Sequence, residues 1–98
     1  MSLGEAGAQS HFVYIVRCAD GTLYTGYARD PASREDVHNS GRGAKYTAGR
    51  RPVRLVYSES FDSVGDALKR EHQIKRYSRA TKEALVRYPN TTKRLPDE

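Results

Sequence analysis

The sequence has no tryptophan, two phenylalanines and a single cysteine, Cys18, among its 98 residues. One cysteine excludes an internal disulfide framework and any zinc site built from several cysteines. Because Cys18 falls at the end of an apolar run, we expect it to be a small buried residue and not a nucleophile. We therefore expect a reducing compartment and no disulfide-linked partner.

Long apolar runs are also missing. No run approaches the roughly 18 residues that a membrane-spanning helix needs. Residues 1–10, MSLGEAGAQS, have neither the basic start nor the apolar stretch of a secretory signal. These absences predict a cytoplasmic protein with no membrane partner.

Acidic residues are in the minority, with 12 against 17 basic residues and a net charge of +5. Only 37% of the residues are apolar, and seven tyrosines supply most of the aromatic bulk. The chain is therefore expected to form one domain with a small core. The basic excess favours a polyanionic partner, nucleic acid before membrane, although a merely soluble basic protein would have the same totals.

The pattern of apolar and turn residues predicts one domain over residues 11–88, with a disordered lead-in at 1–10 and a loose tail at 89–98. The glycine-rich stretch 41–52 is expected to be a loop. The order β-β-α-β-α-α predicts an α+β fold, a small three-stranded antiparallel sheet flanked by helices. The expected strands are 12–17, 23–27 and 53–58, and the expected helices are 31–38, 62–78 and 79–88.

Three polar residues mark the starts of these helices. Asp30 is an N-cap followed by proline at the first helical position. Asp62 or Ser63 opens the long helix, with Asp66 completing a partial capping box after Ser63. Ser78 precedes the last helix.

Residues 12–27, FVYIVRCADGTLYTGY, have the pattern of a β-hairpin with one tyrosine in each strand, Tyr14 and Tyr24. A two-residue turn would put the two rings on opposite faces of the sheet, whereas a three-residue loop, 19–21, would put them on one face. Gly21 in third place favours the three-residue loop, because that position needs a left-handed residue. The rings are then either cross-strand packing or groups placed for chemistry.

In that register, strand alternation turns four other side chains toward the core: Val13, Ile15, Leu23 and Thr25.

Glu71 lies in the long predicted helix, three residues after Leu68 and three before Ile74. It therefore falls on the apolar stripe that Val64, Ala67, Leu68 and Ile74 define. A carboxylate there needs a cation or hydrogen-bond donors, since burying it unpaired is costly. An arginine is one candidate partner, and a divalent metal is the other.

No acidic residue occurs between Val37 and Ser58, a stretch that carries five arginines and lysines. This basic window predicts either contacts to a phosphate backbone or a solvated loop. Nothing in it resembles base readout by a recognition helix, so no sequence specificity is expected. The candidate nucleic-acid contacts are Arg42, Lys45, Tyr46, Arg50 and Arg51, to which we add Lys75 from the long helix.

Several short motifs stand in a recognisable order: VYI at 13–15, YTG at 24–26, Arg34 and His38 one helical turn apart, GAKYT, and ALKREHQIK at 67–75. Together they resemble the GIY-YIG nuclease superfamily, in particular its small stand-alone branch. The resemblance covers about residues 11–87. It implies a three-stranded antiparallel sheet flanked by helices, and phosphodiester hydrolysis assisted by one divalent ion, Mg²⁺ or Mn²⁺.

The resemblance also implies roles for single residues. Tyr14 corresponds to a general base or water-positioning tyrosine, and Tyr24 to a tyrosine lining the same site. Arg34 corresponds to the arginine that contacts the scissile phosphate, and Glu71 to the metal-binding glutamate. His38 corresponds to a histidine that supports the site in some relatives.

The first helix departs from the pattern of the superfamily, because Pro31, Glu35 and Asp36 stand where relatives have leucines and basic residues. The two acids either pair with Arg34 or weaken phosphate attraction. We expect a metal-dependent endonuclease acting on DNA, with DNA repair as its setting; branched or damaged DNA, and RNA, stay open as substrates. The alternative is a non-catalytic nucleic-acid-binding module on the same fold.

Overall fold

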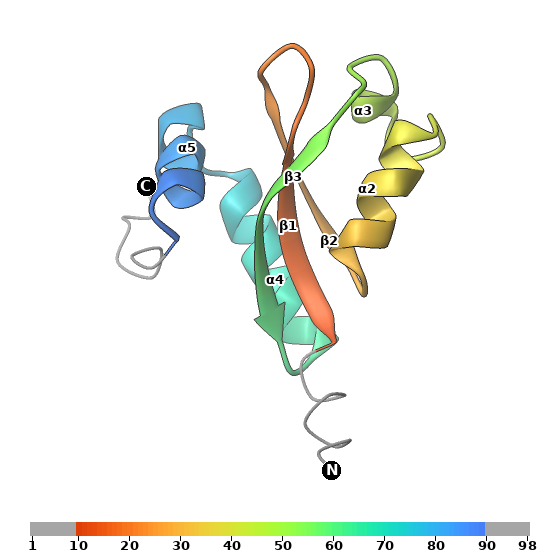
Figure 1. The fold of residues 1–98 in the computed structure, drawn as a ribbon. Coiled ribbons are helices and arrows are strands. Elements are labelled where there is room, and N and C mark those ends of the chain that lie inside the picture. Colours follow the sequence, from red (N-terminus) through yellow and green to blue (C-terminus); the bar gives the residue numbers. More distant parts are fainter. Residues whose placement is uncertain (1–9, 90–98) are drawn as a thin grey trace.

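The computed structural model describes residues 10–89 (Figure 1). The predicted lead-in and tail lie outside the described residues, apart from Ser10 and Pro89. None of the helices in the described part has the length and apolar character needed to cross a membrane.

The first two strands form the predicted hairpin. β1 (His11–Arg17) pairs antiparallel with β2 (Leu23–Ala28), and Val16 stands opposite Tyr24. This register confirms the three-residue loop, in which Gly21 has a φ of 88°. Tyr14 and Tyr24 consequently share one face of the sheet.

The third strand, β3 (Arg54–Phe61), pairs antiparallel with the other side of β1, so the sheet order is β2-β1-β3. The strand extends to Phe61, beyond the predicted end at 58. The register shifts between Ile15, opposite Tyr57, and Val16, opposite Leu55. This irregularity is a β-bulge that inserts one residue of β3 and increases the local twist.

The structure describes four helices: α2 (Pro31–Asn39), α3 (Lys45–Ala48), α4 (Val64–Lys75) and α5 (Arg79–Arg87). Asp30, Ser63 and Ser78 each accept a hydrogen bond from a backbone N–H in the first turn, as predicted. The prediction of a loop over 41–52 is wrong for α3. This short helix has no capping side chain, and its buried Thr47 attaches it to the rest of the protein.

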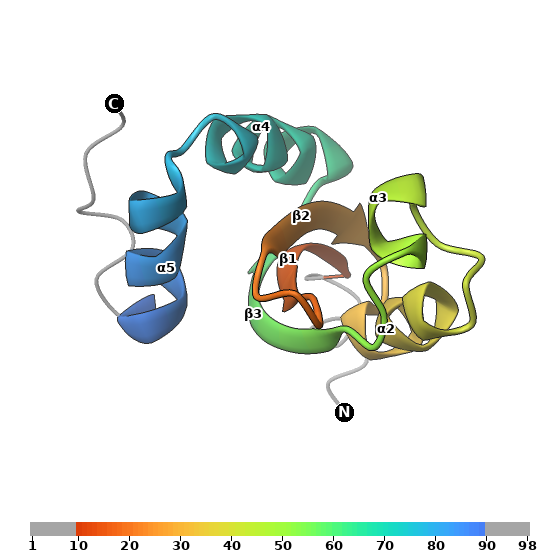
Figure 2. The same cartoon turned by 90° about the horizontal axis from the view of Figure 1, so that it is seen from above.

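Helices cover both faces of the sheet (Figure 2). On one face, Val13 and Ile15 of β1 pack with Ala67, Ile74 and Leu85 of α4 and α5. Thr25 is buried as expected, and Leu23 packs at the edge of this cluster. The α+β class, with three antiparallel strands and flanking helices, is confirmed.

On the opposite face a second cluster lies toward α2 and α3. It joins Tyr14 and Val16 of β1 to three other buried residues, Cys18, Ala28 and Val53. Cys18 is 4% exposed, as expected for a small core residue. Tyr14 is therefore part of a core and, at its phenol end, part of a cavity.

The predicted apolar stripe of α4 is only half right. Ala67 and Ile74 are fully buried, but Val64 and Leu68 are 45% and 40% exposed. The helix contacts the sheet through a narrow face, because Ala67 and Ile74 are seven residues, or two turns, apart. Glu71 lies between them on this face, at the edge of the sheet formed by β2.

Candidate active site

A cavity of about 490 Å³ opens beside β2, between α4 on one side and α2 with the following loop on the other. It brings together residues from four separated segments of the chain. Its lining consists of Tyr14, Tyr24, Gly26, Tyr27, Arg34, His38, Arg42, Gly43, Ala44, Leu68 and Glu71. The five residues to which the resemblance gives catalytic or metal-binding roles are all in this set.

A chain of hydrogen bonds runs through the buried side of the cavity. The Tyr14 hydroxyl lies 2.7 Å from His38 Nε2, and His38 Nδ1 lies 2.8 Å from Thr47 Oγ1. The Thr47 hydroxyl donates its only proton to the carbonyl of Ala44, at 3.0 Å. Thr47 must therefore accept from Nδ1–H of His38, which leaves Nε2 as the acceptor for the Tyr14 O–H.

The protonation states agree with this direction. Burial raises the pKa of Tyr14, and the nearby Tyr24 and Glu71 raise it further against the opposing effect of Arg34. Burial, assisted by the positive charge of Arg34, lowers the pKa of His38 below its ordinary value. At neutral pH the pair is therefore a protonated phenol and a neutral imidazole ready to accept its proton.

Two glycines allow these groups to approach so closely. A Cβ on Gly26, which stands opposite Tyr14 in the hairpin, would lie 2.5 Å from the Tyr14 hydroxyl oxygen. A Cβ on Gly43 would collide with the ring and backbone of His38. Both positions need glycine for space and not for an unusual backbone angle.

Tyr24 links the hydrogen-bonded chain to α3. Its ring meets the ring of His38 edge-on, with centroids 5.4 Å apart, and stacks on Tyr46 at 5.9 Å. The guanidinium of Arg50 lies 3.8 Å above the Tyr46 ring. These contacts make a layered wall of two rings and one cation beside the cavity.

Glu71 supplies the only carboxylate among the residues that line the cavity, and its side chain is 15% exposed. The cation beside it is Lys75, at 3.1 Å, one turn further along α4. Of the two candidate partners, the arginine is therefore replaced by a lysine. Lys75, predicted as a nucleic-acid contact, is the ion-pair partner of this carboxylate, and its contact with nucleic acid stays a prediction.

Arg34 is exposed on α2 and lines the cavity. Of the two possibilities for Glu35, pairing with Arg34 is not observed, because Glu35 accepts a hydrogen bond from the backbone N–H of Leu55 at 2.7 Å. Leu55 borders the bulge of β3, where the register of the ladder shifts. The acid next to Arg34 in sequence thus attaches α2 to the sheet.

The basic window separates into two groups. Arg42 and Lys45 are exposed, and Arg42 lines the cavity. Arg50 and Arg51 hold the loop together, mainly through backbone carbonyls. Although this stretch contains no acidic residue, Arg50 has a counter-charge from outside it, since it pairs with Asp20 of the hairpin loop at 3.1 Å.

Thr47 and the two glycines were not among the residues proposed from the sequence. The GAKYT motif, residues 43–47, contains Gly43 and Thr47. Its place in a recognisable series of motifs was the sequence signal that could have identified these two residues. A loop prediction gave no reason, however, to expect a fully buried threonine. Only contact with His38, nine residues earlier, explains its position.

Comparison with known proteins identifies the family and several similar proteins. The profile described as "GIY-YIG catalytic domain" matches residues 10–84. A UPF0213 protein of Staphylococcus aureus (strain Mu3) is 58% identical over 78 residues, which cover 80% of this chain and 95% of the relative.

Two solution NMR structures have the same fold. The UPF0213 protein BH0048 of Bacillus halodurans is 49% identical, with a TM-score of 0.52, covering 85% of this chain and 94% of that one. The protein EF2693 of E. faecalis is 40% identical, with a TM-score of 0.56, covering 91% and 92%.

Nucleases of the matched family act on nucleic acid and typically use a divalent metal. The match includes every residue that lines the cavity, and the two tyrosine motifs stand opposite each other in one hairpin. This chain belongs to the GIY-YIG catalytic domain family.

Proposed function

We propose that the protein is a divalent-metal-dependent endonuclease that hydrolyses phosphodiester bonds in DNA without sequence specificity. The observation that carries the proposal is the convergence of Tyr14, Arg34, His38 and Glu71 on one cavity. A base, a cation for the phosphate and a carboxylate for a metal are the three parts that such a reaction requires.

Tyr14 and His38 form the base. The attacking water must lose a proton, and the Tyr14 oxygen accepts it while the phenol proton passes to His38 Nε2. Thr47 keeps Nδ1 protonated and Nε2 free for this transfer. Tyr14 and His38 thus act as one unit, because the raised pKa keeps the phenol protonated at rest, and its oxygen can accept the proton of water only as its own proton passes to His38.

Arg34 supports the opposite side of the reaction. Its guanidinium is exposed at the cavity wall and has no side-chain partner among residues 10–89. A guanidinium can form two parallel hydrogen bonds with a phosphate, which fixes the phosphate as well as neutralising it. Arg42, in the same wall, adds positive charge for the adjoining backbone.

Glu71 fits one weakly held divalent ion. Within the described residues no group of three or more histidine, cysteine, aspartate or glutamate side chains could enclose a metal. Mg²⁺ is commonly held by one or two carboxylates, with waters and substrate phosphate completing its shell. We propose one ion, Mg²⁺ or Mn²⁺, at Glu71, where it would offset charge on the phosphate and on the leaving oxygen.

The substrate is proposed from the character of the contacts. Exposed arginine and lysine side chains bind backbone phosphates, and a tyrosine ring contacts base faces, so neither reads base edges.

We place the activity in the cytoplasm, which suits a single buried cysteine. Branched or damaged DNA, as in repair, is the substrate class to test first, with RNA in parallel.

A second candidate is a nucleic-acid-binding module without catalysis. The ion pair between Glu71 and Lys75 favours it, because a lysine already occupies one oxygen of the carboxylate that the metal needs. In that case the same basic surface would bind DNA, and the cavity would be a remnant.

The variant Glu71→Gln separates the two functions. It keeps the side-chain volume but removes the charge that recruits Mg²⁺, while the basic residues that bind the backbone stay in place. We expect metal-dependent cleavage to be abolished and DNA binding to stay within about tenfold, or about 1.4 kcal/mol, of the wild type. Cleavage is measured on labelled branched, single-stranded and duplex DNA with Mg²⁺ or Mn²⁺, and binding without metal.

The matched control is Asp66→Asn, an exposed acid on the same helix that does not line the cavity. It should cut at the wild-type rate. Wild-type protein that cuts none of the substrates in either metal, together with unchanged binding by Glu71→Gln, would select the binding module instead.

A further inference from the structure

A second, smaller hollow of about 200 Å³ lies next to the candidate active site. It is lined by Thr22 and Leu23 at the start of β2, Tyr46 of α3, and Arg79 and Lys82 of α5. Tyr46, in its wall, stacks on Tyr24, which lines the active-site cavity. The two spaces are therefore separated by one pair of stacked rings.

The hollow contains two cations. Lys82 is half-buried and has no ion-pair or hydrogen-bond partner for its amine among residues 10–89. Burial, and secondarily the charge of Lys75, lower its pKa. A partly desolvated amine without a counter-charge is unfavourable, so this position gains stability when an anion enters.

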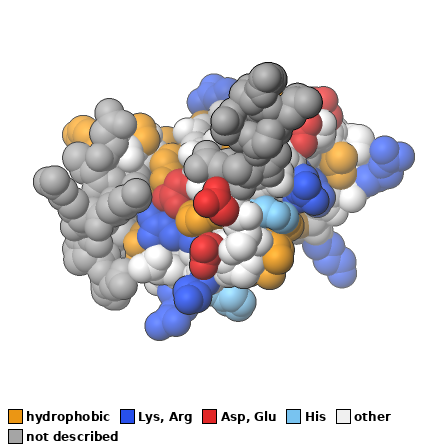
Figure 3. All heavy atoms as spheres, turned by 90° about the horizontal axis from the view of Figure 1, so that it is seen from below, with side chains coloured by type: hydrophobic (Ala, Val, Ile, Leu, Met, Phe, Trp, Pro, Cys, Tyr) orange, Lys and Arg blue, Asp and Glu red, His pale blue; other side chains and the backbone are white. Residues whose placement is uncertain are grey.

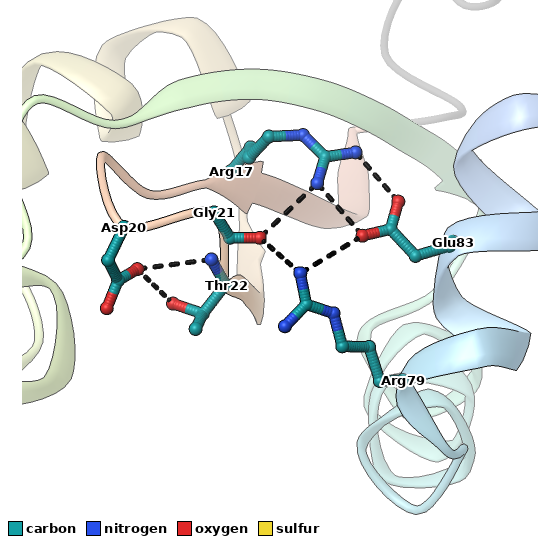
Figure 4. Close-up of polar contacts among 6 residues, drawn as sticks. All are labelled: Arg17, Asp20, Gly21, Thr22, Arg79 and Glu83. Carbon is teal, nitrogen blue, oxygen red and sulfur yellow. Dashed lines mark hydrogen bonds and ion pairs between the residues drawn. The ribbon is translucent and has the colours of Figure 1, made fainter.

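Arg79, an exposed side chain, is oriented by two contacts (Figure 4). Its Nη2 donates to the carbonyl of Gly21 at 2.9 Å and lies 3.7 Å from Glu83. Glu83 is itself engaged by Arg17 through two hydrogen bonds, at 2.8 and 2.9 Å. The nearest acid is thus already neutralised, and the hollow keeps a positive charge.

Size and position indicate what the anion is. About 200 Å³ is below the 300–1,000 Å³ typical of pockets for whole small molecules, so a phosphate-sized group fits better. Leu23 in this hollow and Gly26 in the active-site cavity are three residues apart on β2, or about 10 Å. One nucleic-acid strand has a phosphate about every 3.4 Å along a duplex axis, so the two spaces lie within about three nucleotides.

We propose that this hollow, between the β1–β2 loop, α3 and α5, binds a backbone phosphate of the same strand whose scissile phosphate occupies the active-site cavity. Lys82 and Arg79 bind the phosphate, and the Tyr24–Tyr46 ring pair lies between the two phosphates. The inference rests on the proposed function. It predicts a preference for a nucleic-acid chain over a dinucleotide, because a dinucleotide cannot fill both spaces.

The test compares Lys82→Met with Lys69→Met. The second variant removes the same charge from an exposed lysine of α4 that lines neither space. Binding of a fluorescent single-stranded DNA oligonucleotide is measured in EDTA over a series of KCl concentrations, with a DNA dinucleotide as the short probe. Lys82→Arg restores the charge, and circular dichroism checks the fold of each variant.

For Lys82→Met we expect several-fold weaker binding of the oligonucleotide and a salt slope reduced by about 0.7, the value for one phosphate contact on a single strand. Dinucleotide binding should not change, Lys82→Arg should restore the slope, and Lys69→Met should match the wild type. Identical slopes for the two methionine variants would overturn the proposal. The proposal would also be overturned if inorganic phosphate competed strongly with the oligonucleotide in the wild type only. The hollow would then bind free phosphate.

These outcomes are independent of cleavage. A protein that cuts DNA but shows no Lys82 effect retains the proposed function and loses this site. A protein that cuts nothing but shows the effect loses the proposed function and retains a strand-binding site.

Discussion

Single residues decide where the protons lie in the candidate active site. The Thr47 hydroxyl has one proton, and its bond to Ala44 determines that His38 donates from Nδ1 and accepts at Nε2. A phenol and an imidazole could otherwise exchange roles, and the phenol would then lack an acceptor. Thr47 is therefore a positioning residue for the base, although it does not itself line the cavity.

The depressed pKa of His38 makes folding stability depend on pH. In the unfolded chain the ring titrates near its ordinary value of 6.5, but in the folded protein it binds a proton only at lower pH. The unfolded state therefore binds more protons as the pH falls below 6.5, so the free energy of unfolding decreases. Each unit of pKa depression contributes about 1.4 kcal/mol to this loss.

We expect His38→Gln to flatten the decrease between neutral pH and about pH 5, measured by urea unfolding at several pH values. The exposed histidine His72 provides the control, because His72→Gln should leave the decrease as it is in the wild type. Equal slopes in wild type and His38→Gln would show that protonation of His38 is not coupled to folding.

Among the elements, α5 is attached to the hairpin loop by charged side chains as well as by its buried Leu85. Arg17 forms a two-pronged pair with Glu83, and Arg79 bonds the loop carbonyl of Gly21. The Arg17 and Glu83 side chains are 29% and 28% exposed, whereas those of Arg70 and Glu59 are only 14% and 20% exposed. The second pair joins α4 to β3 in a drier environment.

Glu83→Gln should therefore cost little, about 0.5–1 kcal/mol of unfolding free energy, as for other exposed pairs. Glu59→Gln should cost more, because Arg70 would keep its charge in a less hydrated place. Urea unfolding measures the order. Hydrogen exchange should show faster exchange of α5 and loop amides in Glu83→Gln, with β1 unchanged. A larger loss of unfolding free energy in Glu83→Gln than in Glu59→Gln would contradict the expected order.

Across the whole molecule, the net charge is +5, but the charged side chains differ in whether they already have a partner within the protein. Six carboxylates of the described part are engaged by a cation or a backbone N–H: Asp20, Asp30, Glu35, Glu59, Glu71 and Glu83. On the face opposite the β1–β2 loop and α3, acidic and basic side chains are interspersed (Figure 3). The cations without partners in residues 10–89 include Arg34 and Arg42 at the cavity and Lys82 in the hollow.

We expect DNA affinity to fall steeply with salt, with a slope of about −0.9 for each duplex phosphate contact. The double variant Arg42→Gln/Lys45→Gln should reduce that slope by about 1.8 without lowering stability, because both side chains are exposed. Arg51→Gln is the matched comparison: it should lower stability, since Arg51 bonds two loop carbonyls. Binding titrations at several KCl concentrations measure both slopes, and an affinity insensitive to salt would exclude this surface as a phosphate contact.

Local chemistry in the sequence determined the elements and the hairpin register. Gly21 in third place of the loop is sufficient to put Tyr14 and Tyr24 on one face, because strand side chains alternate. Asp30, Ser63 and Ser78 determined the helix starts, since each bonds a backbone N–H three residues ahead. The order of the tyrosine, arginine, histidine and glutamate motifs carried the family resemblance.

Only the tertiary structure decided which charges are free and which are used. Asp20 reaches Arg50 across 30 residues, and Glu35 reaches the backbone of Leu55 across 20. Periodicity reports which face a residue occupies but not its distant partner, so these carboxylates looked free in the sequence. The same limit concealed the burial of Thr47 in a short helix without a side-chain cap, because α3 is held by contact with His38 and not by its own propensity.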